Sequence, residues 1–382
     1  MKQLSRRDVL RAVPASALAL GLFARCGNES AGADRAGRRP IALANGGRWR
    51  MPGEETPHER TFMAWPSDTE IWGKGLADVQ GAIARIAKAI LRFEPVTLLA
   101  RPEALANARK QCGSGVTVHP APVDDLWARD SLPCLLVSAA KGAAPALAAG
   151  GFRFNGWGGK QKHDGDTQLA AFVAKELGIP LLDAGITGEG GGIEIDGSGT
   201  VLAAASCWVN TNRNPGLDRE ALGRSIIDLL GARRMLWVDG LAGQDVTDGH
   251  IDTLARFAGP TSILIDKTDD RSADPFDLAI RATRRQLEAV RTEAGTPYAF
   301  FVLPQPLTTR RTGPHFVSSY LNYYVCNGGV ICPEFGDASA DGLARDLLAA
   351  RFPGRTVVQV DIDGVAAGGG GIHCATQQQP KT

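Results

Sequence analysis

The chain returns five times to one local arrangement, in which a polar or glycine-rich stretch leads directly into residues that favour a strand. Four of these five approaches carry an Asp, Glu, His or Cys at or near the junction. Similar units that each deliver one reactive group to a shared centre would produce this pattern. Because no obvious linker divides the chain, we expect a single domain over residues 51–382. The approaches are Arg129-Asp130, Glu189 to Gly192, Asp248 to His250, Ser318 to Tyr320 and Gly368 to Cys374.

Helical and strand patterns alternate along the domain, which predicts an α/β fold. Apolar residues repeat at helical spacing in five segments, and the fourth is predicted to end at Gly295. Two strand-like runs contain hairpin turns, at residues 196–199 and 327–329. The expected helices cover 76–90, 169–177, 222–229, 276–294 and 343–352. The expected strands cover 96–100, 116–120, 132–138, 193–205, 253–265, 299–303, 323–332 and 357–362.

The N-terminal fifty residues differ from the rest. A twin-arginine pair, Arg6-Arg7, precedes an apolar run that is too short to cross a bilayer permanently, and small residues follow at 31–33. We interpret residues 1–33 as a Tat-type export signal and residues 34–50 as a flexible lead-in. The mature protein is then periplasmic or extracellular, with no stable membrane anchor. The alternative is a chance arginine pair ahead of an apolar helix.

Composition narrows the functional classes. Hydrophobic residues make up 44% and charged residues 22% of the chain, as in a globular protein. The formal net charge is +1, with no basic block in the domain, which argues against nucleic acid as a partner. The seven cysteines include no CxxC pair, and their odd number leaves at least one thiol unpaired or paired between molecules.

Cys374 is the candidate nucleophile. It lies shortly after four consecutive glycines, Gly368 to Gly371, which allow close backbone approach and unusual φ angles. A thiol at such a turn can lie at the floor of a tight pocket, and it attacks as a thiolate beside a cation. The alternative is a flexible tail with an incidental cysteine, although such tails rarely continue into an Ile-His-Cys-Ala-Thr run.

His250 and Asp252 form the second candidate group. If this segment is a strand, the two side chains share a face, and the carboxylate raises the basicity of the imidazole for acid–base catalysis. A His-x-Asp pair can also bind a metal. No HxH or HxxxH pair in the chain supports a metal site. Taken alone, His250 is equally well explained as a structural histidine.

Carboxylates and a tryptophan complete the set. Trp127 stands among acids in the segment from Asp124 to Asp130, which suits a cationic ligand, although alone this segment is better explained as an exposed acidic loop. Glu189 could face a ligand or cap its glycine turn. The combination favours guanidinium chemistry. Two carboxylates can hold the planar cation, a thiolate can attack its carbon, and a histidine can protonate the departing ammonia.

With these residues in view, the chain resembles agmatine deiminases and the related bacterial-type peptidylarginine deiminases of the guanidino-group-modifying pentein superfamily. The matching motifs are spread over nearly the whole domain. The resemblance implies a pentein fold, a five-bladed pseudo-fivefold α/β propeller of ββαβ-type units with the site at its centre. The motifs include Met51-Pro52-Gly53-Glu54, Asp124 to Asp130, Phe154 to Lys160, Glu189-Gly190-Gly191, Asn210 to Pro215, Gly249 to Asp252, Tyr320-Leu321-Asn322, Gly369 to Cys374 and Gln377 to Pro380.

The resemblance also implies individual roles. Cys374 would form a covalent amidino-cysteine intermediate, and His250 would be the acid and base. Asp130 and Asp252 would hold the guanidinium from two sides. Members of the family need no metal and no organic cofactor. The expected partner is a small cationic guanidino substrate, and the expected reaction converts agmatine and water to N-carbamoylputrescine and ammonia. The question of a homodimer is left open. Glu189 would help line the site, and Trp127 would pack beside the substrate.

Three departures from the family keep a second substrate open. Many agmatine deiminases read Asp-Glu-Thr-Asn-Gly-His before the site aspartate. This chain has Val246 in place of the Glu that senses the far amine, and Asp248 in place of the Asn. Arg153 adds a positive charge, and export is unusual for a polyamine pathway. The alternative is therefore an exported peptidylarginine or arginine-type deiminase that forms citrulline.

Two hypotheses from other functional classes, a cysteine protease and a non-catalytic binding protein, are less well supported by the sequence. In a cysteine protease, carboxylates facing the substrate would repel the developing oxyanion. A non-catalytic binder of cationic metabolites would need only the acids and the tryptophan, not Cys374 and His250.

Overall fold

The computed structural model describes residues 49–138 and 146–382. The predicted export signal and residues 34–48 of the lead-in lie outside the described residues. Within those ranges, strands and helices alternate and the strands form five separate sheets of three or four strands each, so the predicted α/β class is confirmed. None of the helices in these ranges is long and apolar enough to cross a membrane.

Three sheets share one ββαβ pattern, in which an antiparallel pair is followed by a helix and by a strand parallel to the second. The helix is needed because a parallel neighbour can be reached only by a crossover connection. The first contains β8 (Ile193–Ile195), β9 (Thr200–Ala204), α8 (Arg219–Leu230) and β10 (Arg234–Val238). The second contains β11 (Ala255–Phe257), β12 (Ser262–Asp266), α9 (Pro275–Glu288) and β13 (Ala299–Leu303). The third contains β14 (Tyr324–Cys326), β15 (Gly329–Glu334), α10 (Ala338–Arg351) and β16 (Thr356–Asp361).

The other two sheets extend this pattern by one strand. In one, the pattern consists of β5 (Cys134–Ser138), β6 (Leu147–Gly151), α6 (Leu169–Glu176) and β7 (Leu181–Asp183), and β1 (Trp49–Arg50) lies antiparallel to β5. In the other, the last strand β17 (Gln377–Pro380) lies antiparallel to β2 (His58–Ala64), which is followed by α2 (Leu76–Leu91), β3 (Val96–Ala100), α3 (Leu105–Cys112) and β4 (Thr117–Pro120). Strand β17 therefore completes the sheet to which β2, β3 and β4 belong.

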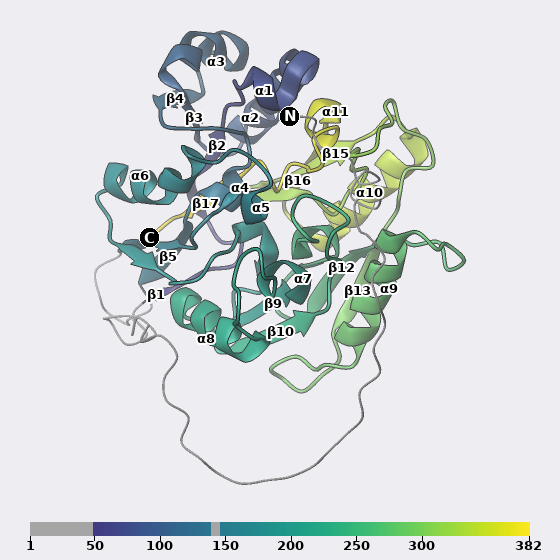
Figure 1. Cartoon of the computed structure of the whole chain (residues 1–382). Helices are drawn as coiled ribbons and strands as arrows, with labels where there is room; N and C mark the ends of the chain where they lie inside the picture. Colours follow the sequence, from purple (N-terminus) through teal and green to yellow (C-terminus); the bar gives the residue numbers. More distant parts are fainter. Residues whose placement is uncertain (1–48, 139–145) are drawn as a thin grey trace, which may run out of the picture.

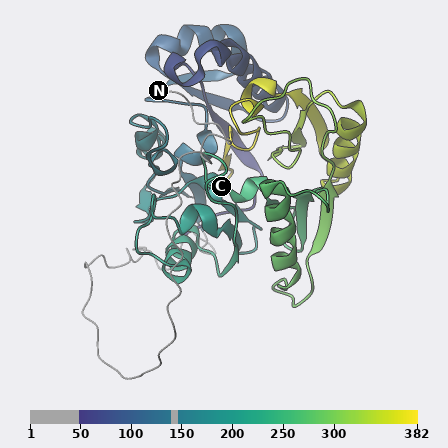
Figure 2. The same ribbon diagram turned by 45° about the vertical axis from the view of Figure 1, so that its right-hand side comes forward.

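Five helices lie at the rim of the molecule and two short ones lie nearer its middle. Figure 1 shows α3, α6, α8, α9 and α10 around the outside, with α4 (Ala128–Ser131) and α5 (Gly156–Gly159) close to the centre. The turned view in Figure 2 keeps the same order, from purple at the top through teal to green and yellow. The remaining short helices are α1 (Thr69–Trp72), α7 (Ala205–Trp208) and α11 (Asp363–Ala366), with 3₁₀ turns at 73–75, 102–104, 166–168, 190–192 and 251–253.

Helix α2 illustrates how the elements are held together. Val79, Ile83, Ile86 and Ile90 fall at helical spacing and are fully buried in a core cluster that includes residues of β3, β15 and β16. Burying each of these side chains stabilises the fold by about 1.5–3 kcal/mol. The predicted apolar stripe is therefore the face of α2 that joins the sheet containing β2 and β3 to the unit formed by β14, β15 and β16.

Helix α9 ends earlier than predicted. Its last residue is Glu288, whereas the sequence pattern placed the end at Gly295. The amide of Thr292 instead donates to the carbonyl of Thr296 at 2.8 Å, and Gly295 lies inside that turn with φ of +78°. The glycine was correctly identified as a left-handed residue, but it serves a tight turn rather than a helix cap.

Candidate active site

The turns before and between strands of several units meet around Cys374. Asp130 belongs to α4, Glu189 precedes the turn 190–192, and His250 and Asp252 lie at the turn 251–253. These five side chains are buried, with exposed fractions of 8% or less. The structure therefore brings together the residues that sequence analysis proposed as catalytic.

Cys374 is held by Asn322. The Asn322 side chain donates from Nδ2 to Cys374 Sγ at 3.3 Å and accepts from the Cys374 amide through Oδ1 at 3.2 Å. The thiol faces Asp252 Oδ2 at 3.5 Å. Burial raises the pKa of Cys374 well above its ordinary value, and the charges of Asp252 and Asp130 raise it further. The resting site therefore contains a thiol rather than a thiolate.

One glycine of the run before Cys374 is required by its surroundings. A Cβ on Gly370 would lie 2.3 Å from the ring of Trp127 and 3.3 Å from Cys374 Sγ. Trp127 is 8% exposed and packs beside Trp72, with 6.3 Å between ring centroids. Trp72 is itself held by Asp125, which accepts from its Nε1 at 2.7 Å. The two rings thus form an aromatic wall next to the thiol.

His250 lies between two carboxylates. Its Nε2 is 3.3 Å from Glu189 Oε2, and its Nδ1 is 3.7 Å from Asp130 Oδ1. Burial alone would lower the pKa of His250, but Asp130 and Glu189 raise it to about 9. The histidine is therefore cationic at neutral pH and can give up a proton. Residues 251–253 form a 3₁₀ turn, so the condition that this segment is a strand is not met; His250 and Asp252 nevertheless both reach the site.

Asp130 is fixed by two donors from other segments. Trp157 Nε1 donates to its Oδ2 at 3.0 Å and the Gly191 amide donates to its Oδ1 at 3.0 Å. Burial raises the pKa of Asp130 to about 6, although the charge of His250 opposes this shift. Gly191 can approach so closely because it has no side chain: a Cβ there would lie 2.7 Å from Asp130 Oδ1.

Asp252 has one occupied and one unoccupied oxygen. Its Oδ2 accepts from His373 Nδ1 at 2.8 Å and from Asn322 Nδ2 at 3.3 Å. Its Oδ1 is buried and has no hydrogen-bond partner in the part of the chain that the structure describes. Burial would raise the pKa of Asp252, but the hydrogen bond and charge of His373 lower it to about 2. An ionised, unpaired oxygen in a buried site calls for a cationic donor.

Glu189 supports His250 rather than lying open to a ligand. Arg213 Nε is 2.7 Å from Glu189 Oε1 and 3.1 Å from Oε2, in addition to the His250 contact. Arg213 NH1 also donates to Asp248 Oδ2 at 2.8 Å, and Lys160 Nζ is 2.7 Å from the same oxygen. The charge of Asp248 is therefore compensated by two cations.

Arg153 does not bring an unpaired charge to the site. Its guanidinium forms an exposed ion pair with Asp183 at 2.6 Å. It therefore gives no support to a carboxylate-bearing substrate.

Sequence analysis did not identify four residues that shape the site: Trp157, Arg213, Asn322 and His373. Each lies in a motif that carried the family resemblance, and that was the only available signal. Their roles depend on contacts with distant segments, such as Asn322 with Cys374, 52 positions away.

No group of three or more His, Cys, Asp or Glu side chains within 49–138 and 146–382 is arranged to hold a metal ion. The six cysteines in these ranges form no disulfide.

The fold and the site define a class: an α/β protein whose buried cysteine thiol lies beside a cationic histidine and several carboxylates, a set of groups suited to a cationic ligand. Comparison with known proteins narrows this class. The family model of the Porphyromonas-type peptidyl-arginine deiminases matches residues 50–380. The chain belongs to this family.

Individual relatives agree with this assignment. A protein of Legionella pneumophila (strain Paris) that carries the provisional name agmatine deiminase is 38% identical over 336 residues, 87% of this chain and 95% of its own. The agmatine deiminase of Pseudomonas aeruginosa (strain LESB58) is 34% identical over 89% of this chain and 98% of its own. The solved agmatine deiminase of Enterococcus faecalis is 30% identical and superimposes with a TM-score of 0.80 over 87% of this chain and 96% of its own.

Proposed function

We propose that the protein hydrolyses the guanidino group of agmatine, giving N-carbamoylputrescine and ammonia through a covalent amidino-cysteine intermediate. The observation that carries the proposal is the buried Oδ1 of Asp252, which has no hydrogen-bond partner among residues 49–138 and 146–382 and belongs to the carboxylate beside the thiol of Cys374. A guanidinium supplies the planar, cationic N–H donors that this oxygen requires. Asp130, on the other side, would accept from the same group.

The first half of the reaction requires a thiolate. Because Asp252 and Asp130 raise the pKa of Cys374, binding of a cation between them would offset their charge and let the thiol release its proton to water, from which the departed ammonia takes up a proton to become ammonium. Cys374 Sγ then forms a bond to the central guanidinium carbon. The cationic His250 protonates one amino group, whose C–N bond breaks, and ammonia leaves. The amidino-cysteine retains the positive charge.

The second half returns the enzyme to its starting state. His250, now neutral, takes a proton from water as the water oxygen bonds to the same carbon. The C–S bond then breaks, the ureido product leaves and Cys374 is restored. Overall, one guanidinium and one water give one ureido product and one ammonium ion. Glu189 and Arg213 hold the His250 ring throughout, and Trp127 flanks the substrate.

The choice of agmatine rests on the relatives. The two named agmatine deiminases of Pseudomonas aeruginosa and Enterococcus faecalis are at least 30% identical over most of both chains. Val246, which replaces the usual Glu, is 36% exposed, and its carbonyl accepts from Lys160. A citrulline-forming peptidylarginine or arginine-type deiminase is the second candidate. It is supported by this loss of a carboxylate and by the peptidyl-arginine deiminases that give the matching family its name.

We also propose that the five sheets are blades of one propeller within a single domain. Three observations support this arrangement. The sheets share the ββαβ order, β17 completes the sheet of β2, and the colours in Figure 1 follow one another in a circle. Export through residues 1–33 remains a prediction from the sequence.

The test is ammonia release by the mature protein with agmatine, free arginine and a short arginine peptide. We expect turnover of agmatine, and its loss in Cys374→Ala with agmatine binding retained in calorimetry. Cys112→Ala is the matched control, since Cys112 ends α3 away from the site. Full activity of Cys374→Ala would refute the assignment of Cys374 as the nucleophile. Turnover of the peptide alone would replace agmatine by peptidylarginine.

A further inference from the structure

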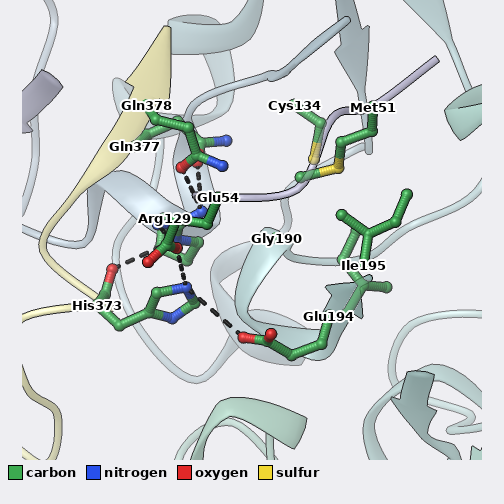
Figure 3. Close-up of a pocket in the computed structure, with 11 residues that line it drawn as sticks. Met51, Glu54, Arg129, Cys134, Gly190, Glu194, Ile195, His373, Gln377 and Gln378 are labelled. Carbon is green, nitrogen blue, oxygen red and sulfur yellow. Dashed lines mark hydrogen bonds and ion pairs between the residues drawn. The ribbon is translucent and has the colours of Figure 1, made fainter. Parts of the chain in front are cut away.

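The ring of His373, the residue before the nucleophile, lies between two carboxylates. Its Nδ1 is 2.8 Å from Asp252 Oδ2 and its Nε2 is 3.0 Å from Glu54 Oε2, and the side chain is only 3% exposed. Figure 3 shows the side of the ring that faces Glu54 and Glu194. A neutral imidazole carries one N–H and would turn a lone pair toward one of these carboxylates. Only the doubly protonated ring donates to both.

The charges around His373 lead to the same state. Three carboxylates face or approach its ring: the buried Asp252, the partly buried Glu54, whose side chain is 12% exposed, and the buried Glu194, at 3.8 Å from Nε2. Two guanidiniums are paired with these acids. Arg129 and Arg256 each lie 3.2 Å from Glu54 Oε2, and Arg256 is also 2.7 Å from Glu194. Three negative charges against two positive ones leave one buried charge, which an imidazolium neutralises.

The far side of this cluster is rigid. Glu54 Oε1 accepts from the amide of Val325 at 2.8 Å, so the carboxylate is fastened to β14 as well as to the two arginines. Arg129 donates from Nε to the carbonyl of His373 at 3.3 Å, and its own amide donates to the carbonyl of Cys374 at 3.1 Å. The same cluster therefore holds the backbone that carries the thiol.

The near side of the cluster reaches the substrate site. His373 and Asn322 both donate to Oδ2 of Asp252, and Oδ1 is the oxygen without a partner in the described part of the chain. If the His373 donor were lost, the carboxylate could rotate and its burial would favour the protonated acid. On its other side, Asp252 also feels the charge of His250.

We propose that His373 is a positioning residue, held as an imidazolium between Glu54 and Asp252, that fixes Asp252 with one oxygen turned toward the guanidinium. The kinetic consequences rest on the proposed function. The charge state of the ring does not, and it can be measured without turnover.

The direct test is ¹⁵N NMR of the whole protein labelled at histidine, with the His373 signals assigned by their loss in His373→Asn. We expect both ring nitrogens of His373 to carry a proton at neutral pH, because each of them faces a carboxylate. A neutral tautomer of His373 at neutral pH would overturn the proposal, whether or not the enzyme accepts agmatine.

The kinetic test uses the same variant. An asparagine amide can still donate toward Asp252, but it brings no charge and does not reach Glu54. We expect kcat/KM to fall about a hundredfold, the cost of a misplaced binding group. We also expect the acid limb of the pH profile to become steeper and move to higher pH, because Asp252 would then titrate close to Asp130. A merely structural role would lower stability without moving this limb.

His119→Asn is the matched control, because His119 makes a similar pair with Glu176 at 3.1 Å but lies partly exposed and away from the site. It should leave the profile unchanged. An unaltered kcat/KM and acid limb in His373→Asn would contradict the proposal. If the wild-type protein released no ammonia from any guanidino substrate, the proposed function would fail, and the NMR result would still decide the state of His373. If the variant does not fold, the ring signals of His373 are assigned in the wild-type protein through backbone-to-ring correlations, and the same NMR measurement decides the question.

Discussion

At the scale of single residues, the site contains two buried aspartates with opposite pKa shifts. The pKa of Asp130 is raised to about 6 and that of Asp252 lowered to about 2, although both are buried. The difference comes from their partners. Asp130 accepts from a neutral indole and a backbone amide, whereas Asp252 accepts from His373, whose charge overcomes the cost of burial. Burial favours the protonated form of both acids, and only the neighbours of Asp252 overcome it.

This difference predicts a bell-shaped pH dependence of kcat/KM. Below about pH 6 Asp130 becomes protonated and no longer attracts the guanidinium, and above about pH 9 His250 loses the proton that ammonia needs. Initial rates of ammonia release at low agmatine concentration would give both limbs. Activity that persisted unchanged well below the acid limb would show that an ionised Asp130 is not required.

Asp252→Asn should have opposite effects on turnover and on thiol reactivity. Turnover should fall by a factor of about 10² or more, since one of the two acids that hold the substrate is lost. Alkylation of Cys374 by iodoacetamide should become faster, because a charge that raises the thiol pKa has been removed.

Mass spectrometry of the labelled peptide measures the alkylation rate. Asp164→Asn, at an exposed position, is the control. Slower alkylation of Cys374 in the Asp252 variant would contradict the electrostatic account.

At the scale of elements, the short turn over residues 156–159 joins three parts of the site. All four of its residues have positive φ, including Trp157 at +56°, which is unusual for a side chain other than glycine. Trp157 donates to Asp130, Lys160 to Asp248 at 2.7 Å and Gln161 to Asp125 at 2.8 Å. Such backbone strain is maintained where it serves a site.

Two neighbouring glycines in this turn allow a matched test. Gly158 and Gly159 have φ of +86° and +74°, so an alanine at either position costs about 1–2 kcal/mol in backbone strain. Only Gly158→Ala adds a clash, because its Cβ would lie 2.5 Å from Asn212, which donates to Asp248; the Cβ at 159 meets nothing within 4 Å.

Thermal unfolding should show a loss in both variants, larger for Gly158→Ala. Only Gly158→Ala should also lose most of its kcat/KM. Equal activity of the two variants would show that the turn does not position the site.

The sequence predicted the elements whose signals are local. The apolar stripe of α2, the hairpin between β8 and β9 and the approach to each site residue follow from spacing and turn residues. Strand β17 was not predicted, because Gln377-Gln378-Gln379 is polar and yet buried, and its side chains are matched by groups such as Arg129 that arrive from other segments. Arg213 and Asn322 were missed for the same reason. The site depends on pairings across the chain, whereas the fold class depends on local periodicity.

At the scale of the whole molecule, the two ends of the domain are joined in one sheet. Strand β17 pairs with β2, and Arg129 donates to the side chains of Gln377 at 2.7 Å and Gln378 at 2.9 Å. Arg129 stands next to Asp130. The C-terminal strand is therefore connected to the site as well as to the sheet.

Deletion of residues 377–382 should abolish the folded state. We expect a loss of more than about 5 kcal/mol, comparable with the whole stability of an ordinary domain, because a buried strand and the partners of Arg129 are removed together. Deletion of only Lys381 and Thr382, which are exposed, is the control and should cost little. Circular dichroism melting distinguishes the two, and a cooperative transition in the longer deletion would refute the role of β17.

The position of β17 also has a consequence for the protein during its synthesis. Within the domain, the ribosome makes the site carboxylates and His250 before Cys374. It makes Cys374 before β17, the strand that completes the sheet of β2. Until then, β2 keeps an unpaired edge, which is a site for association with other growing chains. A polypeptide released before residue 374 has no Cys374, so it cannot form the amidino-cysteine.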